Sequence, residues 1–155
     1  MNNRLICKKA NQLVRFYRTR DPFEMIKGMN VILVFHPLKD VRGFYQYFQR
    51  NNIIYIDEGL DEFEKRFVCA HELGHMILHK KTNAIFMDTK THFKSDRFEQ
   101  EANLFAVDLL IPDEIVLNNP GFTIEQLARL TGFEEKLIRF KAYNKQKNER
   151  EHYGF

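Results

Sequence analysis

The stretch FVCAHELGHMILHKK, residues 67–81, determines how the rest of the chain is interpreted. It places His71, Glu72, His75 and His79 among apolar residues. Burying an ionisable side chain is costly unless it has a partner. The stretch is therefore either a helix with a histidine-rich polar face, or half of a metal site in which the metal is the partner of the histidines.

The periodicity of the apolar residues predicts a helix from about Asp61 to His79. Successive helical residues are rotated by about 100°, so His71 and His75 share one face and can bind one Zn²⁺. Glu72 lies beside that face, where a carboxylate can act as the general base of metal-assisted hydrolysis. Gly74 costs a helix about 1 kcal/mol, and a close approach by another backbone would explain it.

A catalytic zinc needs a third protein ligand besides an open position for water. A second helix, expected over about Asp96–Leu110, offers Glu99 and Glu101, which point about 200° apart. Glu99 shares its face with small residues that permit close packing on the histidine helix, and with Asn103. This pattern favours Glu99 as the third ligand, with Asn103 hydrogen-bonded to a ligand. Glu101 is expected to be an ordinary surface carboxylate.

The two blocks AHELGHMILH (70–79) and FEQEANLFAVDLLIP (98–112) together resemble the ImmA/IrrE family of zinc metallopeptidases, and the resemblance extends over residues 5–140. It implies that His71, His75 and Glu99 bind Zn²⁺ in a gluzincin-like site and that Glu72 is the catalytic residue. It further implies a cytoplasmic endopeptidase. The implied substrate is a helix-turn-helix repressor encoded by a phage or mobile element, or in a stress-response locus.

The roles of the remaining histidines and of two tyrosines are less specific. His79 has turned away from the ligand face, so packing or a hydrogen bond is expected of it rather than ligation. Cys69, on the opposite face, is expected to be a small buried hydrophobe. The sequence does not select a residue for stabilising the oxyanion; the candidates are His36, His92, His152, Tyr45 and Tyr47.

Between the N-terminal region and the histidine helix, the sequence predicts a small sheet. VILVF (31–35), VRGFYQYF (41–48) and IIYI (53–56) are rich in β-branched and aromatic residues. The turn residues 50–52 indicate a hairpin between the second and third runs. We expect an α+β fold in which a three-stranded antiparallel sheet packs against both ligand-bearing helices. Residues 41–48, as an edge strand, would hold an extended substrate by strand addition.

Residues 3–20 are predicted to form a basic helix, followed by a second short helix that begins at Asp21-Pro22 and stops at Gly28. The basic face is either solvated or a contact for an acidic partner. The formal net charge of +3 does not by itself indicate nucleic acid. Two cysteines without a signal-peptide pattern favour a reducing cytoplasm. No run of about eighteen apolar residues predicts a membrane span.

The C-terminal segment, residues 118–155, is predicted to form a helical pair that follows a peptidase domain over residues 1–117. A helix from Thr123 to Gly132 and another from about Glu134 have the rhythm of a helix-turn-helix. The second of these helices is expected to fray into the polar tail KQKNEREHYGF (145–155). Glu134 and Glu135 would meet phosphates at the start of a recognition helix, which disfavours DNA binding. Packing on the catalytic domain or docking of a protein partner is the preferred interpretation.

The sequence therefore predicts a zinc endopeptidase. The principal alternative is a regulatory protein that keeps zinc for structure and binds a repressor or DNA without cutting it. Hydrolysis of a non-peptide amide is a third possibility. The substrate, the cleavage site and the oligomeric state stay open.

Overall fold

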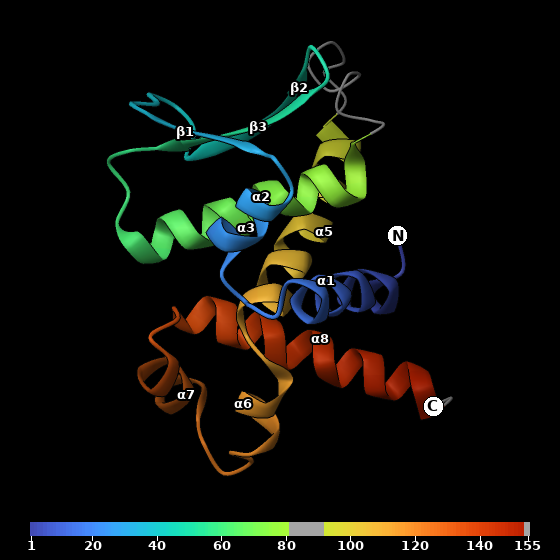
Figure 1. Ribbon diagram of the computed structural model, residues 1–155. Coiled ribbons are helices and arrows are strands. Elements are labelled where there is room, and N and C mark those ends of the chain that lie inside the picture. The colour runs from blue at the N-terminus through green and yellow to red at the C-terminus, as the bar shows by residue number, and fades with distance from the viewer. Residues whose placement is uncertain (81–91, 154–155) are drawn as a thin grey trace.

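The computed structural model describes the backbone of residues 1–80 and 92–153 and the side chains of residues 1–80 and 97–147 (Figure 1). Over these residues the fold is α+β, as predicted, with helices at both ends of the chain and one small sheet. In chain order the elements are α1 (Asn3–Tyr17), α2 (Pro22–Gly28), β1 (Ile32–His36), β2 (Gly43–Phe48), β3 (Asn51–Asp57), α3 (Glu62–His79), α5 (His92–Leu110), α6 (Asp113–Leu117), α7 (Ile124–Thr131) and α8 (Glu135–Tyr153).

The sheet has the order β1-β3-β2, so β2 is an edge strand, as expected. The prediction of a fully antiparallel sheet is wrong, because β1 pairs with β3 in parallel while β2 pairs with β3 antiparallel. After β1 the chain crosses to the far edge and forms β2, and the hairpin then returns β3 between the two, pointing the same way as β1. The direction of β1 is thus set by this crossover rather than by the composition of the strands.

The hairpin turn begins one residue earlier than predicted and is one residue shorter. Phe48 pairs with Asn51, so the loop consists of Gln49 and Arg50 alone, with φ of 47° and 66°. Two consecutive residues with positive φ match the twist of a two-residue hairpin, and asparagine or glycine is usual there. The Asn51-Asn52 pair, which suggested the turn, instead begins β3.

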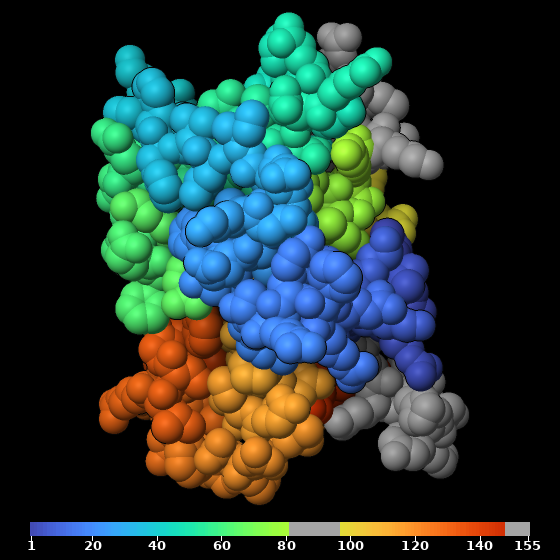
Figure 2. Space-filling model, in the orientation of Figure 1, coloured from blue at the N-terminus to red at the C-terminus, as the bar shows by residue number. Residues whose placement is uncertain are grey.

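The sheet lies over α3, and α5 crosses α3 on the side away from the sheet (Figure 1). Tyr45, Ile54 and Ile56 bury their side chains in the core that the sheet shares with α3. In Figure 2 the N-terminal helices, in blue, cover one face of the molecule between the sheet and the C-terminal helices. Among the described residues, no helix combines the length and the apolar composition needed to cross a bilayer.

Gly74 lies where α3 and α5 cross. A Cβ added there would come within 3.3 Å of the Ala102 backbone and 3.1 Å of the Phe105 ring. The close backbone approach expected at this glycine is therefore present. It brings α3, at a position between its two site histidines, against the middle of α5.

The predicted starts of α2 and α3 are both confirmed by their N-terminal caps. The Asp21 side chain accepts a hydrogen bond from the Phe23 amide, with Pro22 as the first helical residue. Asp61 and Glu64 form a reciprocal capping box at the start of α3. α1 is shorter than predicted and ends at Tyr17, where Arg18 turns left-handed with φ 55°.

The C-terminal helices form much as expected, with two differences. α6 was not predicted, because five residues of mixed polarity carry little periodic signal. α8 continues to Tyr153 through a polar segment that was expected to fray. Between α7 and α8, Gly132 adopts φ 76°, the left-handed conformation that favours glycine. The domain boundary at residue 117 stays a prediction.

Candidate functional site

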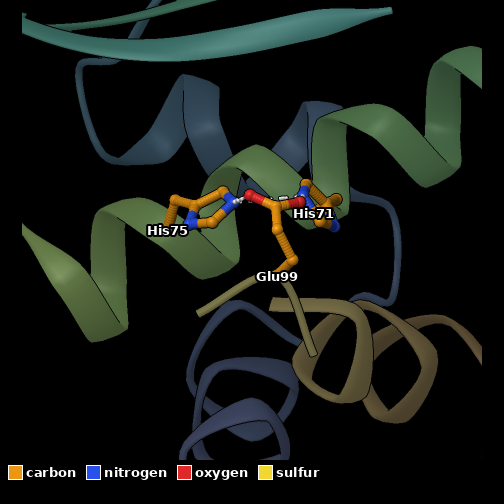
Figure 3. A group of neighbouring side chains, drawn as sticks. All are labelled: His71, His75 and Glu99. Carbon is orange, nitrogen blue, oxygen red and sulfur yellow. Dashed lines mark hydrogen bonds and ion pairs between the residues drawn. The ribbon is translucent and has the colours of Figure 1, made fainter. Parts of the chain in front are cut away.

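Three side chains predicted to act together meet between α3 and α5. His71 and His75 project from one face of α3, and Glu99 projects toward them from α5 (Figure 3). Glu99 Oε2 lies 3.1 Å from His71 Nε2, and Oε1 lies 3.1 Å from His75 Nε2. The two Nε2 atoms are themselves 3.1 Å apart. All three ligand atoms fall within 4.8 Å of one another, a spacing that can hold a metal ion.

The hydrogen bonds behind the histidines fix which ring nitrogen carries a proton. His71 Nδ1 lies 2.9 Å from Asn103 Oδ1. An amide oxygen only accepts, so Nδ1–H is the donor, and the Nε2 lone pair of the neutral ring points at Glu99. The contact expected of Asn103 with one of the histidines is therefore present. This hydrogen bond fixes the orientation of the His71 ring, as hydrogen bonds to the non-ligating nitrogen do for histidines in metal sites.

The charge on Glu99 is strongly favoured. The His71 and His75 imidazoles, each 3.1 Å from a carboxylate oxygen, hold the pKa of the Glu99 carboxyl far below its usual range. Burial opposes a charged His71, but Glu99 and Glu72 outweigh it and raise the pKa of His71. An anionic carboxylate that is half exposed thus faces the nitrogens of two largely buried imidazoles.

This donor set fits a divalent cation. The lone pairs of two Nε2 atoms and a carboxylate converge on one point and repel each other unless a proton or a cation lies between them. Two imidazoles and one carboxylate are a ligand set of catalytic zinc sites, which leave a further position for water or substrate. A zinc ion would satisfy all three groups at once.

Glu72 is buried beside this group, with 7% of its surface exposed. Burial raises the pKa of its carboxyl, although the charges of His71 and His75 and a hydrogen bond from the Tyr45 backbone oppose the shift. Strand β2 lies close by, since a Cβ added to Gly43 would come within 3.7 Å of Glu72 Cγ. The carboxylate therefore lies between the histidine helix and strand β2.

Three of the candidates for oxyanion stabilisation have described side chains. The Tyr45 hydroxyl donates a hydrogen bond to Asn52 Oδ1 at 2.8 Å, and burial together with Tyr47 raises the pKa of Tyr45 to about 12. Tyr47 is half exposed, with Lys80 Nζ 4.6 Å from the centre of its ring. His36 lies exposed at the end of β1. The side chains of His92 and His152 lie outside the described ones, so the choice stays open.

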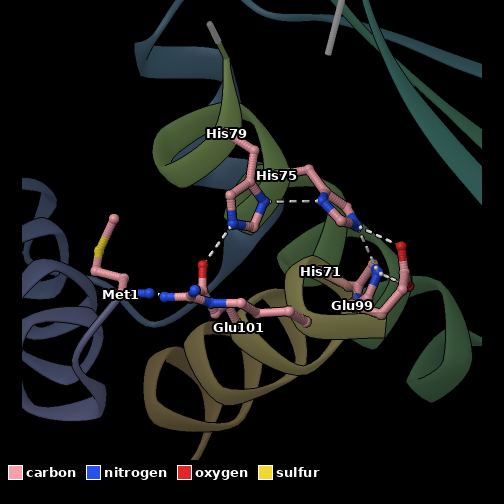
Figure 4. A network of polar contacts seen from close by, with 7 residues as sticks. Met1, His71, His75, His79, Glu99 and Glu101 are labelled. Atoms are coloured by element: carbon pink, nitrogen blue, oxygen red, sulfur yellow. Dashed lines mark hydrogen bonds and ion pairs between the residues drawn. The ribbon is translucent and has the colours of Figure 1, made fainter. Parts of the chain in front are cut away.

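Glu101 is where the sequence reasoning failed. It was expected at the surface, but only 7% of it is exposed, and it contacts His79 Nε2 at 2.9 Å. Arg97 Nε donates to it at 3.1 Å, and the Met1 amine forms a further ion pair with it (Figure 4). The error arose because α5 was assumed to have a solvent face. Its apolar run LFAVDLLI (104–111) was the available signal that the helix is enclosed on several sides.

His79 is placed as predicted, outside the group that could hold a metal but in contact with it. Its Nδ1 lies 3.1 Å from His75 Nδ1, and its ring packs against Phe98 with centroids 4.3 Å apart. Burial lowers the pKa of His79 more than Glu101 raises it, so the neutral ring is favoured. Cys69 is fully buried, as expected.

A helix carrying HExxH, crossed by a helix that brings a glutamate to its two histidines, is the arrangement expected of a gluzincin-like metallopeptidase. The chain matches the family model of Peptidase M78, the IrrE N-terminal-like domain, over residues 26–143, and therefore belongs to the ImmA/IrrE metallopeptidase family. The predicted resemblance is thus confirmed.

Two relatives support the assignment. The chain is 37% identical over 147 residues to immunity region protein 2 of Bacillus phage phi105, covering 93% of each protein. It is 29% identical over 127 residues to the metallopeptidase ImmA of Bacillus subtilis, covering 77% of this chain and 73% of that protein. The family implies a metal-dependent peptidase.

Proposed function

We propose that this chain is a zinc-dependent endopeptidase acting in the cytoplasm. The observation that supports the proposal most strongly is the convergence of His71, His75 and Glu99, whose three ligand atoms lie within 4.8 Å of one another. These residues would hold the ion. When bound, Zn²⁺ lowers the pKa of a water molecule toward neutrality and polarises the carbonyl of the peptide bond.

Glu72 supplies the proton transfer. In the ionised form it takes the proton of the attacking water, and it then donates that proton to the amine that leaves. Burial raises the pKa of Glu72, which makes the protonated form accessible nearer to neutral pH. The carboxylate thus serves as base and then as acid within one turnover.

The free edge of β2 binds the substrate as an added strand. Among the described residues no further strand pairs with this edge, since β2 is outermost in the order β1-β3-β2, and the Tyr45 backbone contacts Glu72. An extended peptide paired with β2 would therefore pass beside the general base. Binding of an extended segment beside the general base suits an endopeptidase rather than an enzyme for small amides.

The substrate we propose is a helix-turn-helix transcriptional repressor of a phage or mobile element. The family resemblance suggests this class of protein, and the similarity to an immunity region protein of phage phi105 supports the setting. Of the C-terminal helices, α8 already packs on α5, and the proposal is that this helical pair docks the protein partner rather than DNA.

The test is to incubate the purified chain and Zn²⁺ with the helix-turn-helix protein encoded beside its gene, and to analyse the products by mass spectrometry. We expect a single internal cut that disappears when a chelator removes the metal. An intact repressor that nevertheless loses its operator would instead support the non-proteolytic alternative, in which zinc is structural. That outcome would overturn the proposal.

A further inference from the structure

A chain of hydrogen bonds runs from Glu101 through His79 to His75 (Figure 4). Glu101 Oε2 lies 2.9 Å from His79 Nε2, and His79 Nδ1 lies 3.1 Å from His75 Nδ1. The far side of the His75 ring presents Nε2 to Glu99 at 3.1 Å. All three links therefore lie on one path, from a buried carboxylate to the candidate metal centre.

The direction of each hydrogen bond follows from its acceptor. A carboxylate only accepts, so His79 Nε2–H donates to Glu101. In neutral His79 the other nitrogen, Nδ1, then carries a lone pair and accepts from His75 Nδ1–H. His75 Nε2 is left without a proton, and its lone pair points at Glu99. The path thus selects the ring tautomer that can ligate a metal through Nε2.

Glu101 is held firmly enough to serve as the fixed end of the path. Arg97 and the Met1 amine both contact its other oxygen, Oε1. The His79 side chain is almost fully buried and packs against Phe98, so its ring has little freedom to turn away. The charge of Glu101 is therefore balanced, and the geometry of His79 is set from both sides.

The two histidines of the site are supported by different kinds of group. His71 donates Nδ1–H to an amide oxygen, Asn103 Oδ1. His75 donates to a second histidine that is in turn anchored by a carboxylate. Asn103 and Glu101 both come from α5, the helix that carries Glu99. One helix thus supplies a ligand and fixes the tautomers of the other two.

We propose that His79 and Glu101 are positioning residues that hold His75 in its Nε2-ligating tautomer and orientation, and so set the affinity of the site for zinc. This inference rests on the proposed zinc site. Neither residue contacts the metal position in this arrangement; both act through His75.

The test compares two substitutions of His79 by zinc affinity, measured in competition with a chromogenic chelator. His79→Phe keeps an aromatic ring against Phe98 but offers no acceptor to His75, and we expect the zinc dissociation constant to rise about 10–100-fold. His79→Asn places Oδ1 where Nδ1 was and restores the acceptor, so most of the affinity should return. As a matched control, His36→Phe makes the same exchange at an exposed position and should leave zinc affinity unchanged.

A role in packing alone predicts the opposite order, because phenylalanine fills the space of the ring better than asparagine does. The inference is therefore overturned if His79→Phe binds zinc as tightly as the wild type, or if His79→Asn binds no more tightly than His79→Phe. If His79→Phe does not fold, Glu101→Gln and Glu101→Leu take its place. Glutamine keeps an acceptor for His79 and leucine does not, so equal zinc affinity in these two variants would also overturn it.

Nitrogen NMR of the zinc-loaded wild type tests the tautomer without any substitution. A proton on His75 Nδ1, with Nε2 on the metal, is expected; the reverse assignment contradicts the inference. If the wild type binds no zinc, both the proposed function and this inference are wrong. If zinc binding and cleavage are unchanged in every variant of His79 and Glu101, this inference is wrong but the proposed function is not affected.

Discussion

Glu99 shows how much a single carboxylate controls in this molecule. Among the described side chains of α5, it is the one that contacts both Nε2 atoms of the α3 histidines. Without its charge, two imidazoles remain, and two neutral ligands hold zinc poorly. The ion pairs with both histidines also join α3 to α5 at the site.

Replacing Glu99 by glutamine should therefore raise the zinc dissociation constant at least about 100-fold. This effect is larger than that of losing a residue that only hydrogen-bonds to a ligand. The shape of the side chain is kept, so the helix content should not change. Zinc content after gel filtration measures the effect. Glu62→Gln, on the exposed first turn of α3, is the control and should retain its zinc. Stoichiometric zinc in Glu99→Gln would remove Glu99 from the ligand set.

At the scale of elements, the site depends on how closely α3 and α5 approach. Gly74 permits that approach, because a side chain there would meet the Ala102 backbone at 3.3 Å. Backbone atoms cannot turn aside as a flexible side chain can. The distance between the two helices is therefore set by the absence of one Cβ.

Gly74→Val should destabilise the fold by about 1–3 kcal/mol through overpacking, despite the gain in helix propensity over glycine. It should also weaken zinc binding, since the helices that carry the ligands are pushed apart. Chemical denaturation and zinc titration measure both effects. Gly121→Ala is the matched control, because a Cβ at that position meets nothing within 4 Å. An equally stable Gly74→Val that binds zinc normally would contradict the role of the crossing.

The second element-scale prediction concerns the edge of β2. Phe48 and Asn51 flank a two-residue turn and form a hydrogen-bonded pair, so bonds to β3 alternate and the Tyr47 N–H points to the free edge. Tyr47→Pro removes that donor without breaking the ladder. We expect about a tenfold lower kcat/KM with zinc content unchanged, as for the loss of one hydrogen bond. Tyr47→Ala controls for the side chain and should be less affected; equal activity of Tyr47→Pro and wild type would argue against strand addition.

The sequence carried different amounts of information about different elements. The spacing of HELGH and the small face of the second helix predicted which side chains meet, since local periodicity fixes the faces of helices. The direction of β1 could not be predicted, because it depends on where the chain crosses the sheet. The burial of Glu101 could not be predicted either, because it depends on which helices enclose α5 rather than on the sequence of α5 itself.

At the scale of the whole molecule, α5 links the site to the C-terminal helices. Lys141 of α8 is buried, with 3% of its side chain exposed, and forms ion pairs with Asp108 and Asp113. Asp108, from the last part of α5, is itself buried. Burial disfavours the charge on Lys141, but these two carboxylates outweigh it and raise the pKa of Lys141. This cluster fastens α8 to the helix that carries Glu99.

Lys141→Met should destabilise the protein by about 3–5 kcal/mol, because it leaves the Asp108 carboxylate buried without its partner. The midpoint of urea denaturation measures the change. Lys136→Met removes an exposed lysine that pairs with Glu134 and should change stability by only about 0–1 kcal/mol. If the two substitutions had equal effects, α8 would not depend on the buried cluster.

The most direct test of the central claim measures zinc content and repressor cleavage on the same sample of Glu72→Gln. The three proposed ligands are untouched, so the variant should hold zinc like the wild type. Its glutamine cannot accept the proton of the attacking water, so cleavage should fall by at least about 100-fold. A variant that keeps both zinc and wild-type cleavage would contradict the role of Glu72 and, with it, the assignment of the site as a peptidase centre.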